Sequence, residues 1–206
     1  MDAPELPQLY LITPPQIELD SFPAQLGAVL DAHPIACVRL ALATRDEDKL
    51  ARAADALREV THARDVALVI AEHTLLAARL GVDGVHLLDG ARSVRHARKE
   101  LGEDAIVGAF CGGSRHEGMA AGEAGADYVA FGPARASALG TGDHAEEDVF
   151  HWWSDMVEVP CVAEGDLDVE TIRALAPYTD FFGISEIWSG DDPAAALKVL
   201  AAAMTS

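Results

Sequence analysis

The sequence is poor in cysteine and in positive charge, and both shortages narrow what the chain can be. Its three cysteines, Cys37, Cys111 and Cys161, lie far apart and stand beside apolar runs. An odd, scattered set argues against a disulfide framework and a zinc site and predicts buried thiols. With 15 Lys and Arg against 34 Asp and Glu, the formal net charge is −19. Such a field repels nucleic acid and anionic membranes, so we expect a small-molecule ligand instead.

Long hydrophobic runs are also absent, although half of the residues are hydrophobic. No segment approaches the roughly 18 unbroken apolar residues that a membrane span needs. The first five residues contain neither the basic region nor the apolar run of an export signal. These features predict a cytoplasmic protein without a membrane partner. A length of 206 residues suits one well-buried domain.

One pattern, a short apolar run followed by a turn and a helix-length segment, repeats eight times along the chain. The runs are almost wholly apolar, which is typical of strands buried on both faces of a parallel sheet. They comprise Leu9–Ile12, Ala36–Leu42, Val66–Ile70, Gly84–Leu87, Ile106–Ala109, Tyr128–Phe131, Cys161–Ala163 and Phe181–Ile184. Eight strand–helix units in about 200 residues predict an α/β fold, a single TIM (β/α)8 barrel over residues 1–206.

Helix start and stop signals agree with this alternation. The helix predicted over Asp46–Thr61 has apolar residues on one face, and Gly81, Gly102 and Gly125 follow the third, fourth and fifth helical segments, where a left-handed residue is favoured. The predicted N-caps are Ser21, Asp46, Thr74, Ser93, Ser114, Asp168 and Asp191 or Asp192. A doubly wound open sheet is the alternative fold, but the GxGxxG turn typical of it is missing after the first run.

In a barrel of this kind the reacting groups stand at the carboxyl ends of the strands. Five carboxylates follow the apolar runs, namely Glu72, Asp89, Glu164, Asp166 and Glu186. Glu72 and Asp89 are candidate Mg²⁺ ligands, because that ion prefers hard oxygen ligands. The alternative is that these acids are helix caps and solvated surface. Carboxylates that lie this close also raise one another's pKa, which favours acid–base chemistry near neutral pH.

Other polar candidates lie on the same predicted rim. His73 is a candidate proton carrier, since its charge can change near neutral pH, or it is structural. The turn that begins at Cys111 leads into a helix and offers backbone N–H groups to an anion, or it is a plain turn. Gly132 and Ser185 follow the sixth and eighth runs and are candidate substrate contacts.

The segment after the sixth run is a long polar loop over residues 134–148. Loops of this length in compact domains are commonly functional lids or mobile segments. Trp152 and Trp153 follow it, and with Trp188 they form core, a pocket wall, or an apolar contact that suits a homodimer.

Several segments resemble the thiamine phosphate synthase/TenI family in order and spacing along nearly the whole chain. They are Leu9–Thr13, Gly81–Leu87, Ala124–Val129, Phe131–Pro133 and Val162–Ala163. The resemblance implies a TIM barrel that joins a pyrimidine diphosphate to a thiazole phosphate with Mg²⁺ and releases pyrophosphate. It implies no organic cofactor.

The residues that the resemblance assigns to the diphosphate and the metal differ in this chain. The family carries a Gln and a Lys after the second strand, where this chain has Arg39 and Ala43. An Asn-Asp-Arg motif after the third strand is replaced by Ala71-Glu72-His73. In the family a second Asp binds the metal, and Ala91 takes its position in this chain. Asp89 lies two residues earlier and would reach a metal only from another angle.

The residues assigned to phosphate differ as well. A lysine expected after Pro133 is missing, and a Gly-Gly pair that receives the thiazole phosphate becomes Gly165-Asp166, with Glu186 in the neighbouring loop. A carboxylate about 4 Å from a phosphate oxygen is repelled by about 4 kcal/mol at an effective dielectric constant of about 20. The TenI-type tautomerase reaction needs a His that falls on Pro133.

Three functions stay open. The first is a synthase in which Glu72 and Asp89 hold Mg²⁺ and Arg39 meets the diphosphate. The second is a paralogue that binds or transforms a less anionic ligand, such as an unphosphorylated thiazole or pyrimidine, and the third is a non-catalytic barrel. Site chemistry favours the second. Its predicted catalytic residues are His73, Glu164 and Glu186, and its predicted substrate contacts are Arg39, Cys111, Gly132, Gly165, Asp166 and Ser185.

Overall fold

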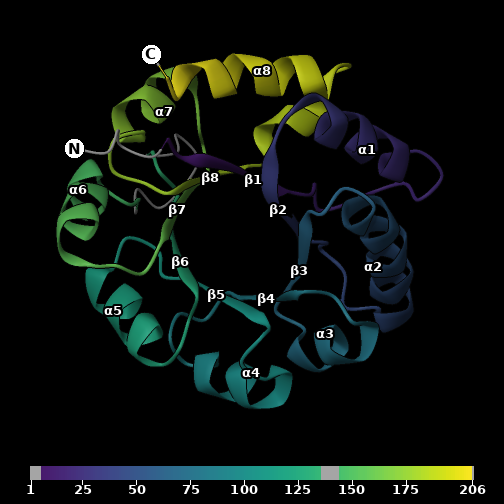
Figure 1. Ribbon diagram of the computed structural model, residues 1–206, viewed down its shortest axis with the longest axis horizontal. Coiled ribbons are helices and arrows are strands. Elements are labelled where there is room, and N and C mark those ends of the chain that lie inside the picture. Colours follow the sequence, from purple (N-terminus) through teal and green to yellow (C-terminus); the bar gives the residue numbers. More distant parts are fainter. Residues whose placement is uncertain (1–5, 136–143, 206) are drawn as a thin grey trace.

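The protein is a closed parallel barrel surrounded by helices, seen in a computed structural model that describes residues 6–135 and 144–205 (Figure 1). The strands are β1 (Gln8–Ile12), β2 (Ile35–Leu40), β3 (Ala67–Ala71), β4 (Gly84–Leu87), β5 (Ile106–Phe110), β6 (Tyr128–Phe131), β7 (Cys161–Glu164) and β8 (Phe181–Ile184). The helices are α1 (Phe22–Ala32), α2 (Glu47–His62), α3 (Thr74–Leu80), α4 (Val94–Leu101), α5 (Arg115–Glu123), α6 (Glu147–Met156), α7 (Val169–Leu175), a short 3-10 helix η1 (Glu186–Ser189) and α8 (Pro193–Ala203). No helix in the described part of the chain is long and apolar enough to cross a membrane.

Each strand pairs in parallel with the next, and β8 pairs with β1 to close the ring. The predicted TIM barrel is therefore confirmed, and the doubly wound sheet is excluded. Several predicted strand boundaries were wrong by one or two residues. Strand β2 runs over Ile35–Leu40 rather than Ala36–Leu42, while β7 continues to Glu164. That extension places a carboxylate on a barrel strand.

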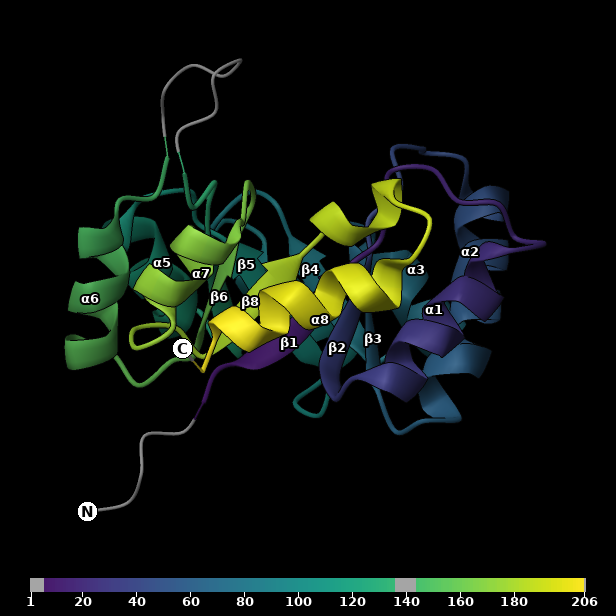
Figure 2. The same cartoon turned by 90° about the horizontal axis from the view of Figure 1, so that it is seen from above.

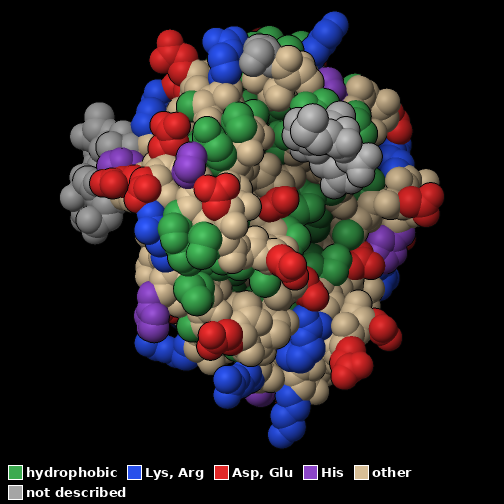
Figure 3. Space-filling view, turned by 60° about the vertical axis from the view of Figure 1, so that its left-hand side comes forward, with side chains coloured by type: hydrophobic (Ala, Val, Ile, Leu, Met, Phe, Trp, Pro, Cys, Tyr) green, Lys and Arg blue, Asp and Glu red, His purple; other side chains and the backbone are tan. Residues whose placement is uncertain are grey.

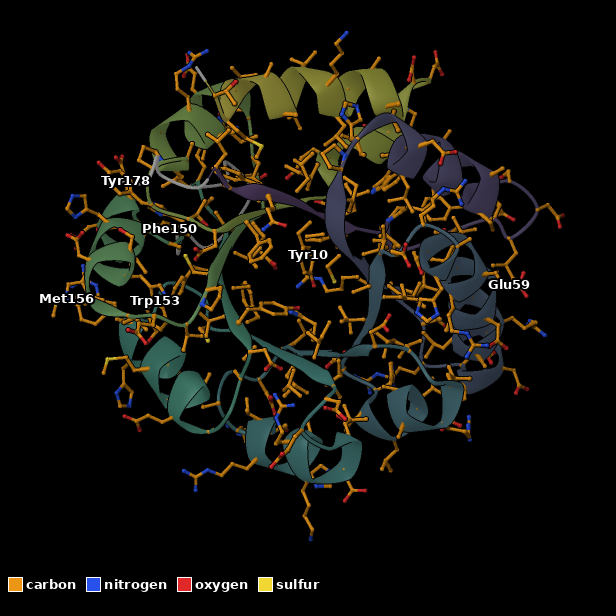
Figure 4. The ribbon with its side chains drawn as sticks, viewed as in Figure 1. Tyr10, Glu59, Phe150, Trp153, Met156 and Tyr178 are labelled. Atoms are coloured by element: carbon orange, nitrogen blue, oxygen red, sulfur yellow. The ribbon has the colours of Figure 1, made fainter. Side chains whose placement is uncertain are left out.

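Two apolar layers hold the fold together. The larger lies between the strands and the helices, where Phe150 and Trp153 of α6 point toward the barrel (Figure 4). The smaller fills the barrel interior and includes Tyr10, which projects into the centre of the ring in Figure 4. Trp153 is 1% exposed, so for this residue the prediction of core placement is confirmed. Figure 3 shows the outer surface of one side, where acidic side chains are spread out rather than gathered.

The helix signals were largely correct. Asp46, Ser114, Asp168 and Asp192 each cap a helix through a side-chain hydrogen bond. The N-cap of α3 is His73 rather than Thr74, because the helix already begins at Thr74. Helix α2 runs over Glu47–His62, one residue later at each end than predicted. Gly81, Gly102 and Gly125 all have positive φ, as expected for residues that end helices.

A repeated aspartate stabilises the amino-terminal end of the barrel. Asp83, Asp127 and Asp180 each stand one residue before an even-numbered strand and accept the backbone N–H of the preceding odd-numbered strand. The acceptor distances are all 2.7 Å, to the nitrogens of Leu68, Val107 and Cys161. A carboxylate thus accepts a backbone N–H where β3, β5 and β7 begin, whereas the N–H of Gln8 in β1 donates to the backbone carbonyl of Asp180.

Replacing Asp180 by alanine is expected to lower the free energy of unfolding by about 1–2 kcal/mol, because the N–H of Cys161 loses its acceptor in a partly buried place. Urea unfolding followed by circular dichroism measures the change. Asp104→Ala is the matched control, since Asp104 is exposed and its side chain makes no hydrogen bond within the described residues. Equal stability of the two variants would contradict the role of Asp180.

Candidate active site at the carboxyl ends of the strands

The loops that follow the strands gather at one end of the barrel. In Figure 2 the barrel is seen from its side, and the purple loop after β1 lies beside α2 along the upper edge. The loops after β6 and β7 touch each other there, because the N–H of Ala134 donates to the carbonyls of Glu164 and Gly165. The sequence predicted a loop over residues 134–148. Residues 136–143 of that loop lie outside the described residues.

The centre of this end is an ion pair across the barrel. Arg39 of β2 donates from Nη2 to Oε2 of Glu164 on β7, at 2.8 Å. The side chains are 5% and 12% exposed, so the pair is nearly buried, with Glu164 the more accessible partner. Nε and Nη1 of Arg39 have no hydrogen-bond partner among the described residues. Two predicted site residues that are far apart in sequence are thus in direct contact.

A chain of hydrogen bonds surrounds this pair inside the barrel. The hydroxyls of Tyr10 and Tyr128 are 2.7 Å apart, and Nδ1 of His86 is 2.8 Å from the Tyr128 hydroxyl. The Arg39 guanidinium lies 5.5 Å from the centre of the Tyr10 ring, within the range of a cation–π interaction. Gly108 leaves room for Tyr128, since a Cβ on that glycine would lie 2.1 Å from the tyrosine ring.

Burial dominates the protonation of these groups. It raises the pKa of Tyr10 and of Tyr128 well above the ordinary value, so both stay neutral hydroxyls. It lowers the pKa of His86 well below the ordinary value, and the positive charge of Arg39 adds to that effect. Burial alone would lower the pKa of Arg39, but the opposite charge of Glu164 outweighs it and the net shift is upward. At neutral pH the centre therefore holds one ion pair and three neutral polar rings.

The three interior rings were not predicted as site residues. Tyr10, His86 and Tyr128 all lie within runs that the sequence marks only as strands. A usable signal was present, since His86 is a polar residue inside an otherwise apolar four-residue strand. In a closed barrel such a residue faces either the interior or the helices, and here it faces the interior.

A carboxylate fills the corner between β7 and β8. Oε1 of Glu186 accepts the backbone N–H of Leu167 at 3.1 Å, and its Oε2 accepts the N–H of Ser185 at 2.8 Å. Glu186 also begins η1, and Trp188 anchors that helix by donating to the carbonyl of Ile12. In TIM barrels the loops after strands 7 and 8, together with a short extra helix, commonly form a phosphate site. Here the carboxylate of Glu186 accepts two backbone N–H groups from these two loops.

The turn that follows β7 is defined by the backbone conformation of two residues. Gly165 and Asp166 both have positive φ, and Asp166 is exposed. A Cβ on Gly132 would lie 2.4 Å from the Glu164 carbonyl oxygen, so glycine is needed where these two strands end. Gly132 therefore packs against Glu164, and Gly165 and Asp166 follow Glu164 directly along the chain.

The two predicted metal ligands stand apart from this centre. Glu72 is exposed, and its N–H donates to the carbonyl of His86. Asp89 accepts the hydroxyl of Ser93 at 2.6 Å. Within the described residues no group of three or more His, Cys, Asp or Glu side chains is placed to hold a metal. The side chains alone therefore fit Mg²⁺ poorly, and its binding stays a prediction.

The remaining candidates have structural partners. His73 precedes α3 as its N-cap residue. Cys111 is buried, and burial followed by the charge of Glu117 raises the pKa of its thiol to about 12, so it is no nucleophile at neutral pH. All three cysteines are buried and free, which confirms the expectation of buried thiols. Ser185 is exposed next to the corner that Glu186 fills.

The fold and the position of the polar residues define a (β/α)8-barrel protein with its candidate site at the carboxyl ends of the strands. A family model described as thiamine monophosphate synthase matches residues 9–186. The chain therefore belongs to the thiamine phosphate synthase/TenI family.

Similar proteins agree with this assignment. The chain is 43% identical to a thiamine-phosphate synthase of Rhodospirillum centenum over 92% of this chain and 94% of the relative. It is 39% identical to one of Erythrobacter litoralis, over 95% of each. The solved structure of a thiamine phosphate pyrophosphorylase from Pyrococcus furiosus matches with a TM-score of 0.81 at 19% identity, covering 96% of this chain and 95% of that one. The last likeness shows the fold alone.

Proposed function

We propose that this chain binds a thiamine-related heterocycle at the carboxyl ends of its strands and that the ligand group beside β7 and β8 carries no phosphate. An unphosphorylated thiazole is the ligand that suits this corner. The proposal depends on one observation, the carboxylate of Glu186 on the backbone N–H groups of Leu167 and Ser185.

The argument from Glu186 is electrostatic. A phosphate that enters this corner must displace the carboxylate from two N–H donors and then remain near it. At about 4 Å and an effective dielectric constant of about 20, the repulsion costs about 4 kcal/mol, or about three decades in affinity. A neutral hydroxyl in the same place meets no such repulsion and can donate to the carboxylate. The corner as built therefore favours an alcohol over its phosphate ester.

The ion pair supplies the chemistry of the centre. Glu164 is the more accessible member of the pair, and in this proposal it accepts a hydrogen bond from a ligand at the end of the barrel. Arg39 donates to Glu164 and has two further nitrogens without a partner among the described residues, which can donate to a ligand. We assign contact roles to Gly132, Gly165, Asp166 and Ser185, which follow β6, β7 and β8 at the same end of the barrel. His73 and Cys111 stay predicted contacts with no direct bond to this centre.

The synthase reaction itself is the second candidate, because the similar proteins from Rhodospirillum centenum and Erythrobacter litoralis are named thiamine-phosphate synthases. In that case Arg39 would meet the diphosphate, and Glu72 and Asp89 would hold Mg²⁺. The ion pair with Glu164 disfavours this role, since Arg39 is already neutralised.

Two measurements separate the candidates. With pyrimidine diphosphate, thiazole phosphate and Mg²⁺, we expect no release of pyrophosphate, and sustained release would establish the synthase instead. By calorimetry we expect the thiazole alcohol to bind at least about tenfold more tightly than its phosphate ester. Tighter binding of the ester to the unmodified protein would contradict the proposal.

The variant Glu186→Ala tests the cause of that preference. It frees the two N–H donors and removes the repelling charge, so we expect affinity for the thiazole phosphate to rise at least tenfold, while affinity for the alcohol falls because its hydroxyl loses the carboxylate acceptor. Glu103→Ala is the matched control, because it removes one exposed carboxylate on the loop between α4 and β5, at the amino-terminal end of the barrel. An equal gain in both variants would mean that net charge, rather than this corner, sets the preference.

A further inference from the structure

A cavity outside the barrel centre lies between the loops after β1 and β2 and the first turns of α2. Its volume is about 300 Å³, at the lower end of the range for small-molecule sites. The loops that form it are joined, because the N–H of Ala43 donates to the carbonyl of Pro15 at 2.9 Å. Figure 2 shows this region at the upper right, where the purple loop reaches over α2.

The wall of this cavity is apolar. Ile17 and Leu42 are partly buried against the main core, and Ala53 is fully buried beneath them. Leu19 stands at the edge and is 38% exposed. A flat apolar ring would cover these side chains and remove them from water, which is favourable in proportion to the area buried.

The polar side of the cavity carries two cations. Lys49 and Arg52 are three residues apart on α2 and therefore share one face of the helix. Both are exposed, and within residues 6–135 and 144–205 their side-chain nitrogens have neither a hydrogen bond nor an ion pair. Among five cavities formed by the described residues, this one has cations and no carboxylate in its lining.

The excess of acidic residues in the whole chain makes a cavity lined by cations alone unusual for this protein. With 34 acidic residues against 15 basic ones, an arbitrary surface hollow of this protein is expected to contain acids. A general attraction for anions is excluded by the net charge of −19. An anion that binds here must be held by local contacts.

We propose that this cavity is a second small-molecule site, selective for an amphipathic anion with one apolar ring and one phosphate or carboxylate group. The ring packs on Ile17, Leu19 and Leu42, and the anionic group meets Lys49 and Arg52. The site is separate from the barrel centre and does not depend on the ligand proposed there. Its position on the loop side of the barrel places it where TIM barrels bind ligands.

Phenyl phosphate is a suitable probe, with benzyl alcohol as its neutral counterpart and inorganic phosphate as its ringless one. By calorimetry and ¹H–¹⁵N NMR titration we expect phenyl phosphate to bind more tightly than either. The backbone shifts should be largest around Ala43 and Ala53. Equal affinity for benzyl alcohol, or shifts centred on other parts of the chain, would overturn the proposal.

The double variant Lys49→Gln/Arg52→Gln should weaken phenyl phosphate at least tenfold and leave benzyl alcohol nearly unchanged. Lys99→Gln/Arg173→Gln removes the same charge from exposed positions outside the cavity and should bind like the unmodified protein. Leu19→Ser should weaken phenyl phosphate without affecting inorganic phosphate. Unaltered thermal unfolding shows that each variant is folded. Unchanged affinity in the first double variant, or an equal loss in the second, would refute the site.

Discussion

Replacing Glu164 by leucine is expected to destabilise the barrel by about 3–5 kcal/mol, because the substitution leaves the charge of Arg39 buried and unpaired. The Arg39 side chain is only 5% exposed, and two of its three nitrogens already lack a hydrogen-bond partner among the described residues. The remaining nitrogen donates to Glu164 at 2.8 Å. Urea unfolding at neutral pH measures the loss, and a decrease below about 1 kcal/mol would show that water reaches Arg39.

The double variant Arg39→Met/Glu164→Leu distinguishes lost pairing from altered packing. Methionine and leucine have volumes close to those of the side chains they replace, and buried ion pairs can be replaced by apolar groups at little cost. We expect the double variant to recover at least half of the stability lost in Glu164→Leu. No recovery would mean that the leucine itself disrupts the end of β7.

The architecture was predictable because it depends on local patterns. Buried parallel strands are short and apolar, and the residues that begin and end helices are chemically distinctive. Boundaries such as that of β2 shifted because an apolar residue outside a strand looks the same as one inside it. The prediction ended β7 one residue before Glu164, because a carboxylate at the end of an apolar run is typical of a loop.

The contacts within the candidate site were less accessible to sequence analysis. Arg39 and Glu164 are 125 residues apart, and their contact depends on ring closure and on which face of each strand points inward. The same holds for the rings of Tyr10, His86 and Tyr128. Glu186 was expected to repel phosphate, but its two backbone donors depend on loop conformation, which no spacing rule supplies.

The contacts of Glu164 and Glu186 have the same electrostatic form, since each carboxylate accepts hydrogen bonds from groups of the chain itself. The barrel holds a buried cation, but the structure neutralises it internally with Glu164. The ends of β7 and β8 hold two backbone donors, and both donate to Glu186. Under the proposed function, each carboxylate stands where an anionic ligand group would otherwise bind, so a ligand of low charge suits the barrel. In the separate cavity, by contrast, the side chains of Lys49 and Arg52 have no partner within the described residues.

Lowering the pH below about 6.5 is expected to destabilise the protein through His86, because the folded state keeps this side chain neutral while the unfolded state protonates it. His86 is fully buried, its Nδ1 is 2.8 Å from the Tyr128 hydroxyl, and burial lowers its pKa well below the ordinary value. Above the unfolded pKa both states are neutral and the contribution is constant. Below it, the unfolded state binds one more proton, so the free energy of unfolding falls by about 1.4 kcal/mol per pH unit until the folded pKa is reached.

The variant His86→Asn isolates this contribution, since asparagine keeps a polar group near the position of Nδ1 but does not titrate. Urea unfolding between about pH 5 and about pH 8 should show a steeper loss for the unmodified protein than for His86→Asn, so that the stability difference between them shrinks as the pH falls. The exposed His96 gives the matched control, and His96→Asn should follow the unmodified protein. Parallel curves for all three proteins would mean that His86 gains a proton inside the folded barrel, which its burial beside Arg39 opposes.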